Sequence, residues 1–250
     1  MKKLLLRISI FLSVVFLGTA CSNKLVEEQT TSKVFMVKPV NFGFNEQTAS
    51  NNVFQVEGYN DEAQVKSLNE SQNYVKQLKE SGIDVIYVED TNEPRTPDSI
   101  FPNNWFSTHK GGTLVLYPMN APNRRAERKE VFIDAIKENS KIEKMLDLSH
   151  WENEDLFLEG TGAMIFDREN HIVYACKSPR MHEKVLDDFC NQMGYKKVVF
   201  SSVDKNGQSI YHTNVMLCLG KTFAVICLDS ITDENEKNNG SKKRSNRYIS

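Results

Sequence analysis

The sequence predicts a mixed α/β fold, and three observations point to it. Short runs rich in β-branched and aromatic residues recur along the chain, each bounded by Gly, Asn, Pro or charge. Longer segments with apolar residues at helical spacing lie between them. Strand pairs alternate with these helices, which indicates a modular sheet, although no exact repeat is visible. With 250 residues, 40% of them hydrophobic, the chain is long enough for one domain with a sizeable core.

In chain order, the first half is predicted to hold strands over residues 34–38, 84–88 and 113–117. A helix is predicted over 61–81, because its apolar residues share one face and Gly82 follows directly. A second helix is predicted over 124–138, where Val131, Ile133 and Ile136 alternate with charged residues that solvate the other face. The second half is predicted to hold a helix over 179–193 and strands over 163–166, 172–175, 197–200, 215–219 and 223–228.

The N-terminus is typical of an exported protein. Basic residues precede an apolar run over 8–17, and the small residues 18–20 lie directly before Cys21. The run is too short for a comfortable membrane span, so we expect a signal peptide over 1–21. Cys21 resembles the acylated cysteine of a bacterial lipoprotein, which would give membrane anchoring through lipid; ordinary secretion is the alternative. The polar residues 22–33 are predicted to form a flexible tether.

Charge and cysteine usage exclude several classes of function. The formal net charge of −2 gives no overall attraction to nucleic acid, whose binders usually carry a basic face. The cysteines show neither paired nor metal-like spacing, so we expect no metal site and no cofactor. Cys218 and Cys227 lie in apolar strand-like runs and are expected to be buried structural thiols. Cys176 lies beside a lysine but has no base next to it, which argues against a reactive thiol.

Three segments carry the polar groups that chemistry requires. Residues 97–109 gather Asp98, Asn104 and other polar side chains around two aromatic rings, which could bind a flat, amide-like group. The alternative is an Asx-turn loop with its aromatic residues in the core. Glu159 stands before Gly160, and His212 precedes an apolar run; the two types form a natural acid–base pair. Taken alone, a glutamate before glycines is typical of a turn. A lone histidine is typically a core or surface residue whose hydrogen bonds are satisfied, not a catalyst.

Taken together, these segments resemble a known superfamily. Residues 97–109, 123–128, 158–167, 174–180 and 211–220 are similar to the guanidino-group-modifying enzymes, or penteins. Within these they resemble the amidinotransferase-like branch, which holds citrulline-utilisation hydrolases and dimethylarginine dimethylaminohydrolase-type proteins. The resemblance runs from about residue 34 to about 236, which we expect to be one domain. It implies a five-bladed αβ-propeller of ββαβ modules around a central substrate channel.

The resemblance also implies roles for individual residues. His212 matches the catalytic histidine that shuttles protons, and Glu159 matches the acidic residue that holds the histidine and the substrate's nitrogens. Asp98 and Asn104 match positions that grip the guanidino or ureido group. Three further residues complete the expected substrate-binding set: Phe101, Asn103 and Asn214.

Two departures from the family pattern bear on the substrate. Relatives often carry a carboxylate where this chain has Asn104, and arginine deiminases carry Asp where it has Asn214. An amide pairs less strongly than a carboxylate with a guanidinium cation. The expected substrate is therefore a small arginine-related compound of the citrulline type.

The residue absent from the pattern is the nucleophile. The family places a catalytic Cys near its C-terminus, whereas residues 237–250 are polar and basic and contain none. We expect this segment to be a disordered, aberrant tail and the last module to be missing or incomplete. The chain as written is then expected to be inactive. The alternative function is a non-catalytic ligand-binding lipoprotein or a degenerate remnant.

Overall fold

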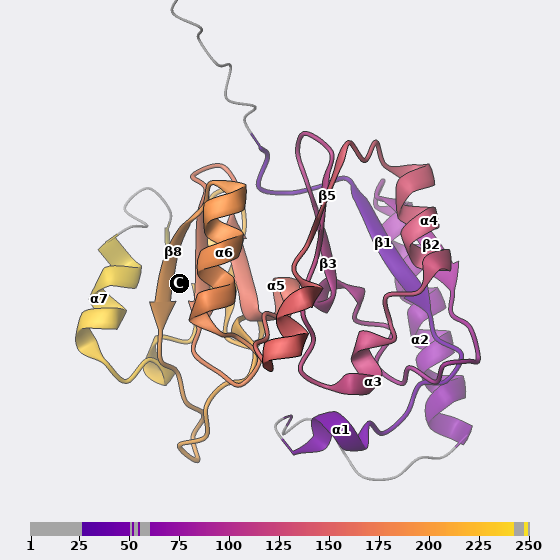
Figure 1. The fold of residues 1–250 in the computed structure, drawn as a ribbon, viewed down its shortest axis with the longest axis horizontal. Helices are drawn as coiled ribbons and strands as arrows, with labels where there is room; N and C mark the ends of the chain where they lie inside the picture. Colours follow the sequence, from indigo (N-terminus) through magenta and orange to yellow (C-terminus); the bar gives the residue numbers. More distant parts are fainter. Residues whose placement is uncertain (1–26, 51, 53–54, 56–60, 243–247, 250) are drawn as a thin grey trace, which may run out of the picture.

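The computed structural model describes residues 27–50, 52, 55, 61–242 and 248–249, and within them the strands form four small sheets (Figure 1). The predicted signal peptide and Cys21 lie outside these residues. In the first sheet, β1 (Lys33–Lys38) pairs in parallel with β2 (Asp84–Glu89). Helix α2 (Asp61–Glu80) connects them, because parallel neighbours require a crossover.

The other three sheets share one order of elements, two antiparallel strands followed by a helix and a third strand parallel to the second. The second sheet has β3 (Phe106–His109), β4 (Thr113–Leu116), α4 (Glu130–Asn139) and β5 (Lys144–Asp147). The third has β6 (Met164–Asp167), β7 (Ile172–Cys176), α6 (Glu183–Met193) and β8 (Lys196–Phe200). The fourth has β9 (Leu217–Leu219), β10 (Phe223–Ile226), α7 (Glu234–Lys242) and β11 (Tyr248–Ile249).

Short helical turns join these units. The α-helical turns are α1 (Glu46–Ala49), α3 (Pro122–Arg125) and α5 (Gly160–Ala163). The 3₁₀ turns are η1 (Pro102–Asn104), η2 (Ser149–Glu154), η3 (Thr213–Val215) and η4 (Leu228–Ser230). In Figure 1, α5 lies between the half that carries α6 and α7 and the half that carries α2 and α4, while α1 and α3 lie along the lower edge.

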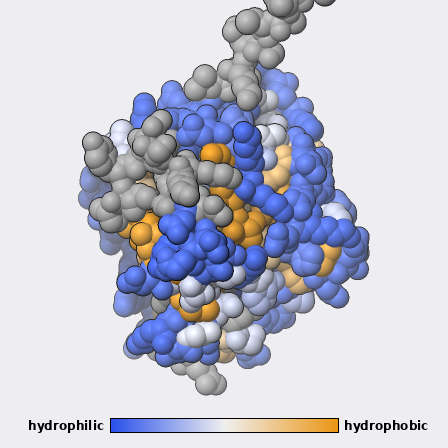
Figure 2. Space-filling view, turned by 90° about the vertical axis from the view of Figure 1, so that its left-hand side faces the viewer, coloured by the Kyte–Doolittle hydropathy of each residue, from blue (hydrophilic) through white to orange (hydrophobic). Residues whose placement is uncertain are grey.

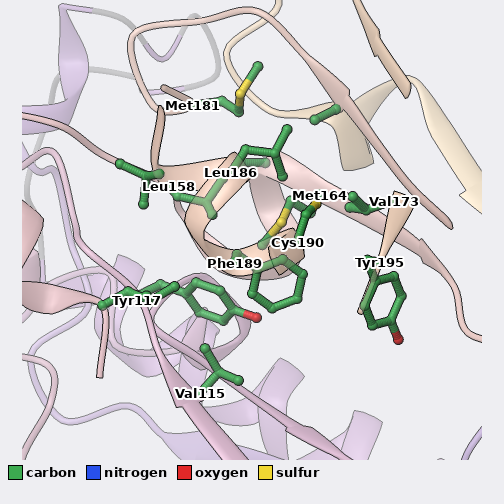
Figure 3. Packing of buried hydrophobic residues seen from close by; sticks show 14 of the residues in the cluster. Val115, Tyr117, Leu158, Met164, Val173, Met181, Leu186, Phe189, Cys190 and Tyr195 are labelled. Carbon is green, nitrogen blue, oxygen red and sulfur yellow. The ribbon is translucent and has the colours of Figure 1, made fainter. Parts of the chain in front are cut away.

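The core forms where the sheet of one unit meets the helix of the next. Val37 of β1 packs with Phe132 and Ile136 of α4, and the rings of Phe35 and Phe132 are 6.1 Å apart. Val115 of β4 belongs to a larger cluster with Phe189 and its neighbours on α6 (Figure 3). Each junction is therefore a sheet face buried against an amphipathic helix.

The helix predicted over 124–138 is wrong as a single element. It is divided into α3 and α4, because Lys129 takes an extended conformation with φ −76° and ψ 145°. The Lys129 Nζ atom bonds to Asp90 Oδ1 at 2.6 Å and Thr96 Oγ1 at 3.0 Å, which ties the start of α4 to the loop after β2. A tertiary contact thus overrides the local helical pattern.

The two ends of the described chain differ from the prediction. Residues 27–31, expected in a flexible tether, lie on the domain: Glu27 is buried and accepts from Tyr195 Oη at 3.1 Å, and Gln29 donates to the carbonyls of Phe166 and Leu219. Within the segment expected to be disordered, 237–242 belongs to α7 and β11 pairs with β10. Pairing with an existing strand supplies order that the polar composition alone does not predict.

Cysteines and membrane segments complete the description. Cys218 and Cys227 are exposed, contrary to the prediction of buried thiols, while Cys176 and Cys190 are buried. Cys218 lies on β9, and Cys227 directly follows β10. Among the described residues, every helix is too short or too polar to cross a membrane.

Candidate active site

The predicted site residues lie in the short turns that open three of the sheets. Asn104 ends η1 directly before Trp105 and β3, Glu159 precedes α5 and β6, and His212 precedes η3 and β9. Turn α5 packs against both η1 and η3, so the starts of three sheets meet at one place. Residues far apart in sequence are brought together by this repeated arrangement.

Glu159 and His212 form a buried pair at this meeting point. His212 Nε2 lies 2.8 Å from Glu159 Oε2, and the two residues are 5% and 0% exposed. The backbone N–H of Asn120 donates to the other carboxylate oxygen of Glu159 at 3.1 Å. The carboxylate is therefore held at both oxygens and orients the imidazole ring.

The electrostatics of the pair favour an ionised glutamate and a neutral histidine. Burial opposes the charge of Glu159, but the hydrogen bond from His212 and the charges of Arg180 and Arg124 outweigh it and lower its pKa to about 2. Burial lowers the pKa of His212 more than Glu159 raises it. An ionised carboxylate only accepts, so Nε2 carries the proton and Nδ1 of His212 is free to accept one.

Two arginines accompany the pair, although the sequence analysis assigned them no role. Arg180 Nη1 lies 3.3 Å from Glu159 Oε2, and the guanidinium carbon is 4.8 Å from the centre of the Tyr211 ring. Arg124 Nη1 lies 3.9 Å from the same oxygen of Glu159 and 2.8 Å from Asn104 Oδ1. Both arginines are 2% exposed, so each is a buried cation matched to buried acceptors.

Asp98 is held by donors from the segment before α2. Its Oδ2 atom accepts from Asn45 Nδ2 at 2.7 Å and from Thr48 Oγ1 at 3.3 Å, and its Oδ1 atom accepts from Gln55 Nε2 at 3.5 Å. Asn45 is also the N-cap of α1, since its side chain accepts from the Gln47 amide. The Asp98 carboxylate, 5% exposed, is thus fixed at the cavity wall.

These groups surround one cavity of about 580 Å³. Asp98, Asn104, Arg124, Arg180 and His212 line it, with Glu159 behind His212. The remaining predicted ligand-binding residues line the same cavity: Phe101, Asn103 and Asn214. The predicted site residues thus share one cleft, while Trp105 is fully buried in the core, as the Asx-turn alternative expected of the aromatic residues.

The described residues that line the cavity include no cysteine. Cys176 contacts Thr213, the residue after His212; its thiol donates to the Ile210 carbonyl at 3.3 Å, and burial raises its pKa. A buried thiol with a raised pKa is a poor nucleophile. The described part of the chain also holds no group of three His, Cys, Asp or Glu residues that could bind a metal ion.

Four small α/β sheets with a Glu–His pair, an Asp and two arginines around one cavity define a protein of the guanidino-group-modifying, or pentein, class. A family model described as N,N dimethylarginine dimethylhydrolase, eukaryotic, matches residues 38–249. The chain therefore belongs to this family of hydrolases that modify guanidino groups. The match includes residues 237–249, which the sequence analysis assigned to an aberrant tail.

Solved structures support the fold. The N-terminal domain of ArgZ, a cyanobacterial arginine dihydrolase, matches with a TM-score of 0.66 and 18% identity over 87% of this chain and 75% of that one. The chain spans only 29% of full-length ArgZ. The dimethylarginine dimethylaminohydrolase of Pseudomonas aeruginosa, complexed with citrulline, matches with a TM-score of 0.54 and 14% identity over 82% of this chain and 73% of that one. No curated protein matches the chain significantly in sequence.

Proposed function

We propose that this chain binds a small arginine-related compound, with a citrulline-like ureido group favoured, and that it hydrolyses such compounds slowly or not at all. One observation carries the proposal: Asp98, Glu159 and His212 surround a cavity whose described lining contains no cysteine. Polar groups suited to grip and protonate a substrate line the cavity, whereas a thiol is not among its described lining residues. A non-catalytic ligand-binding role is the alternative that the same observation allows.

The chemistry of the family explains why the cysteine matters. A thiolate attacks the trigonal carbon of the guanidino or ureido group, a histidine protonates the departing nitrogen, and water releases the covalent intermediate. His212 and Glu159 are placed for the proton transfers. Loss of a covalent nucleophile costs several orders of magnitude in rate. The ArgZ structure with its substrate is of a mutant in which a cysteine is replaced by serine, which supports a cysteine requirement in that protein.

Two observations support the proposed ligand class: the ligands bound by solved relatives, and the two asparagine side chains that line the cavity. Solved relatives hold L-arginine, ornithine or citrulline. This chain has Asn104 and Asn214 at the cavity, where a carboxylate would favour a guanidinium cation. The exchange of carboxylate for amide supports a neutral ureido group over arginine.

We infer further that the four sheets are successive modules of an αβ-propeller, and that no helix of a following module covers the fourth sheet within the described residues. The repeated junction of sheet and following helix supports this. The middle strands β4 and β7 are buried on both faces, whereas Phe223 and Val225 on β10 are 51% and 47% exposed. Figure 2, which looks onto the side that carries α7, shows apolar surface there. A crystal structure in which a helix of the same chain covers Phe223 would contradict the inference.

Export is proposed on sequence grounds alone. The basic and apolar segments before Cys21 support a lipoprotein signal, with secretion into the periplasm or medium as the alternative. Metabolic labelling with a fatty acid tests it, with Cys21→Ala as control. A labelled Cys21→Ala variant, or an unlabelled wild-type chain, would contradict lipidation.

The function is tested with the purified chain. Citrulline, arginine and methylated arginines are supplied, and ammonia, ornithine and citrulline are measured, while isothermal titration calorimetry follows binding. We expect citrulline binding and little or no turnover. Strong turnover abolished by iodoacetamide would show a working cysteine and contradict the proposal; variants of Cys176, Cys218 and Cys227 would then identify it. Absence of any binding would contradict the ligand assignment.

A further inference from the structure

Residues 27–31 form a strap that crosses one end of the domain, while the candidate cavity lies at the other end. We propose that, once Cys21 is acylated, this strap holds the domain against the lipid bilayer by its own end, so that the cavity lies on the side away from the membrane. The inference rests on the proposed lipidation of Cys21 and adds an orientation to it. A water-soluble ligand would then reach the cavity without meeting the bilayer.

Three strands define the two ends of the domain. β3, β6 and β9 each begin just after one of the turns that meet at the candidate site, η1, α5 and η3. The strap contacts the same strands where they end. After β3, the backbone N–H of Lys110 donates to Glu27 Oε1 at 3.4 Å. After β6, the backbone N–H of Arg168 donates to Gln29 Oε1 at 3.0 Å, and at the end of β9 the Leu219 carbonyl accepts from Gln29 Nε2 at 3.2 Å.

Strap and cavity therefore lie at opposite ends of the same strands. Figure 1 agrees with this arrangement, because the described chain enters in the upper part of the molecule, whereas α1 and α3 lie along the lower edge.

The strap is fixed to the domain from residue 27 onward. Glu27 is 9% exposed, and its carboxylate pairs with Arg168 and accepts from Tyr195 Oη at 3.1 Å. Gln29 Nε2 also donates to the Phe166 carbonyl at 2.8 Å. Pulling the strap away would leave the Arg168 guanidinium without this carboxylate and would break the hydrogen bonds of Gln29. Glu27 therefore serves as a fixed attachment point.

The length of the chain limits the distance between the lipid and this attachment point. Six residue steps separate Cys21 from Glu27. A polypeptide of that length spans at most about 20 Å in any conformation. A compact domain of about 220 residues has a radius of gyration of about 17 Å and is therefore about 40 Å across. The connection is shorter than the domain, so the cavity end cannot reach the bilayer while the strap stays in place.

Charge at the strap end does not explain the orientation by itself. Exposed lysines at this end include Lys110, Lys144 and Lys196, but exposed Glu28 and Glu169 lie there too. A face with charges of both signs has little net attraction to anionic headgroups. We therefore assign the orientation to the short connection, and a chain without the acyl group should not bind vesicles.

Short-range fluorescence quenching by lipids with nitroxide headgroups measures the orientation. The acylated chain, with Cys218→Ser and Cys227→Ser, is reconstituted in phosphatidylcholine vesicles; the other two described cysteines are buried. A fluorophore is attached at Lys110→Cys, at the strap end, or at Lys205→Cys, which is exposed in the loop before His212. We expect quenching to be about threefold or more stronger at position 110, because only that label stays within reach of the anchor.

A longer connection is the matched control. About 20 Gly and Ser residues inserted directly before Glu27 raise the full reach of the connection to about 90 Å. The insertion lies outside the strap contacts, so the domain keeps its fold and its anchor. The domain can then turn over, and the two labels should be quenched to similar extents.

Metabolic labelling with a fatty acid, measured on the same chains, separates the outcomes. An acylated chain quenched equally at both positions, or more strongly at position 205, would overturn the orientation and leave lipidation standing. A quenching difference that survives the insertion would do the same, as would vesicle binding by the Cys21→Ala variant. A wild-type chain that takes up no fatty acid would overturn both lipidation and orientation.

Discussion

Gly162 lies where the first turn of α5 touches the other two turns of the site. A Cβ at this position would overlap Asn104 Nδ2 and would lie 2.7 and 2.8 Å from His212 Cε1 and Nδ1. Contacts this short cannot persist, so a neighbour must move. The glycine is therefore a requirement of the site, which explains why the turn after Glu159 is built from small residues.

Gly162→Ala is expected to weaken citrulline binding by about tenfold or more, because displacing Asn104 and His212 separates groups that must act together. Calorimetry measures the loss. Gly207→Ala is the control: it also strains a turn, with φ +77°, but it meets no atom within 4 Å and lies outside the residues that line the cavity. Its effect should be limited to about 1 kcal/mol of stability. Equal binding losses in the two variants would show that Gly162 has no special relation to the site.

Among the elements, the strands predicted from sequence are those that are apolar throughout. β4 and β7 are buried on both faces and are predicted almost to the residue. β3 is missed because Ser107 and His109 resemble surface residues, yet Ser107 Oγ lies 2.8 Å from His109 Nε2 and 2.6 Å from Tyr117 Oη. Their burial depends on partners from another strand, which no local pattern contains.

The candidate site also contains residues that the sequence predicts and residues that only the fold reveals. The order of motifs points to Asp98, Glu159 and His212, because an acid or a histidine at a strand start is visible in the sequence. Arg124 and Arg180 are not predicted to have roles, since an arginine is ordinarily exposed. Their burial follows only from acceptors that the fold collects around them.

Lys129 holds the loop between β2 and η1 through several contacts. Lys129 Nζ contacts Asp90 Oδ1 and Thr96 Oγ1, together with the carbonyls of Thr91 and Pro94 at 3.2 and 3.1 Å. The Asp90 side chain is 0% exposed. Lys129→Met should therefore lower the free energy of unfolding by about 3–5 kcal/mol, because it leaves a buried carboxylate unpaired.

Urea denaturation followed by circular dichroism measures this effect. Lys66→Met provides the matched control, since Lys66 pairs with Glu70 at 3.8 Å on the exposed face of α2. An exposed pair of this kind contributes less than about 1 kcal/mol. Similar losses of unfolding free energy in the two variants would contradict a stabilising role for the Lys129 contacts. Because Asp98 lies in the same loop, Lys129→Met should also weaken ligand binding.

In the molecule as a whole, two buried histidines tie stability to pH. His109 contacts Ser107 and Arg168 in the part of the domain against which residues 27–31 pack. Its pKa is lowered to about 3 by burial and by the charges of Arg168 and His171. His212, in the candidate active site, has its pKa lowered by burial. Both are neutral in the folded protein at neutral pH. In the unfolded chain each binds a proton near its ordinary pKa of about 6.5.

Below about pH 6.5 the two histidines therefore bind more protons in the unfolded state than in the folded state, and together they outweigh the opposite contribution of Glu127, whose pKa burial raises to about 7. The free energy of unfolding should therefore fall as the pH is lowered. Each histidine contributes a slope of up to about 1.4 kcal/mol per pH unit, and for His109 the loss continues toward its folded pKa. Glu159, with its pKa lowered to about 2, adds a loss of the same sign below about pH 4.5.

Urea denaturation from about pH 8 to about pH 5 measures the slope. His109→Gln, which keeps a hydrogen-bonding side chain beside Ser107, should reduce the slope by about one proton, whereas His150→Gln at an exposed position should leave it unchanged. Stability that rises on acidification, or a slope that His109→Gln does not alter, would show that His109 is not buried in its neutral form.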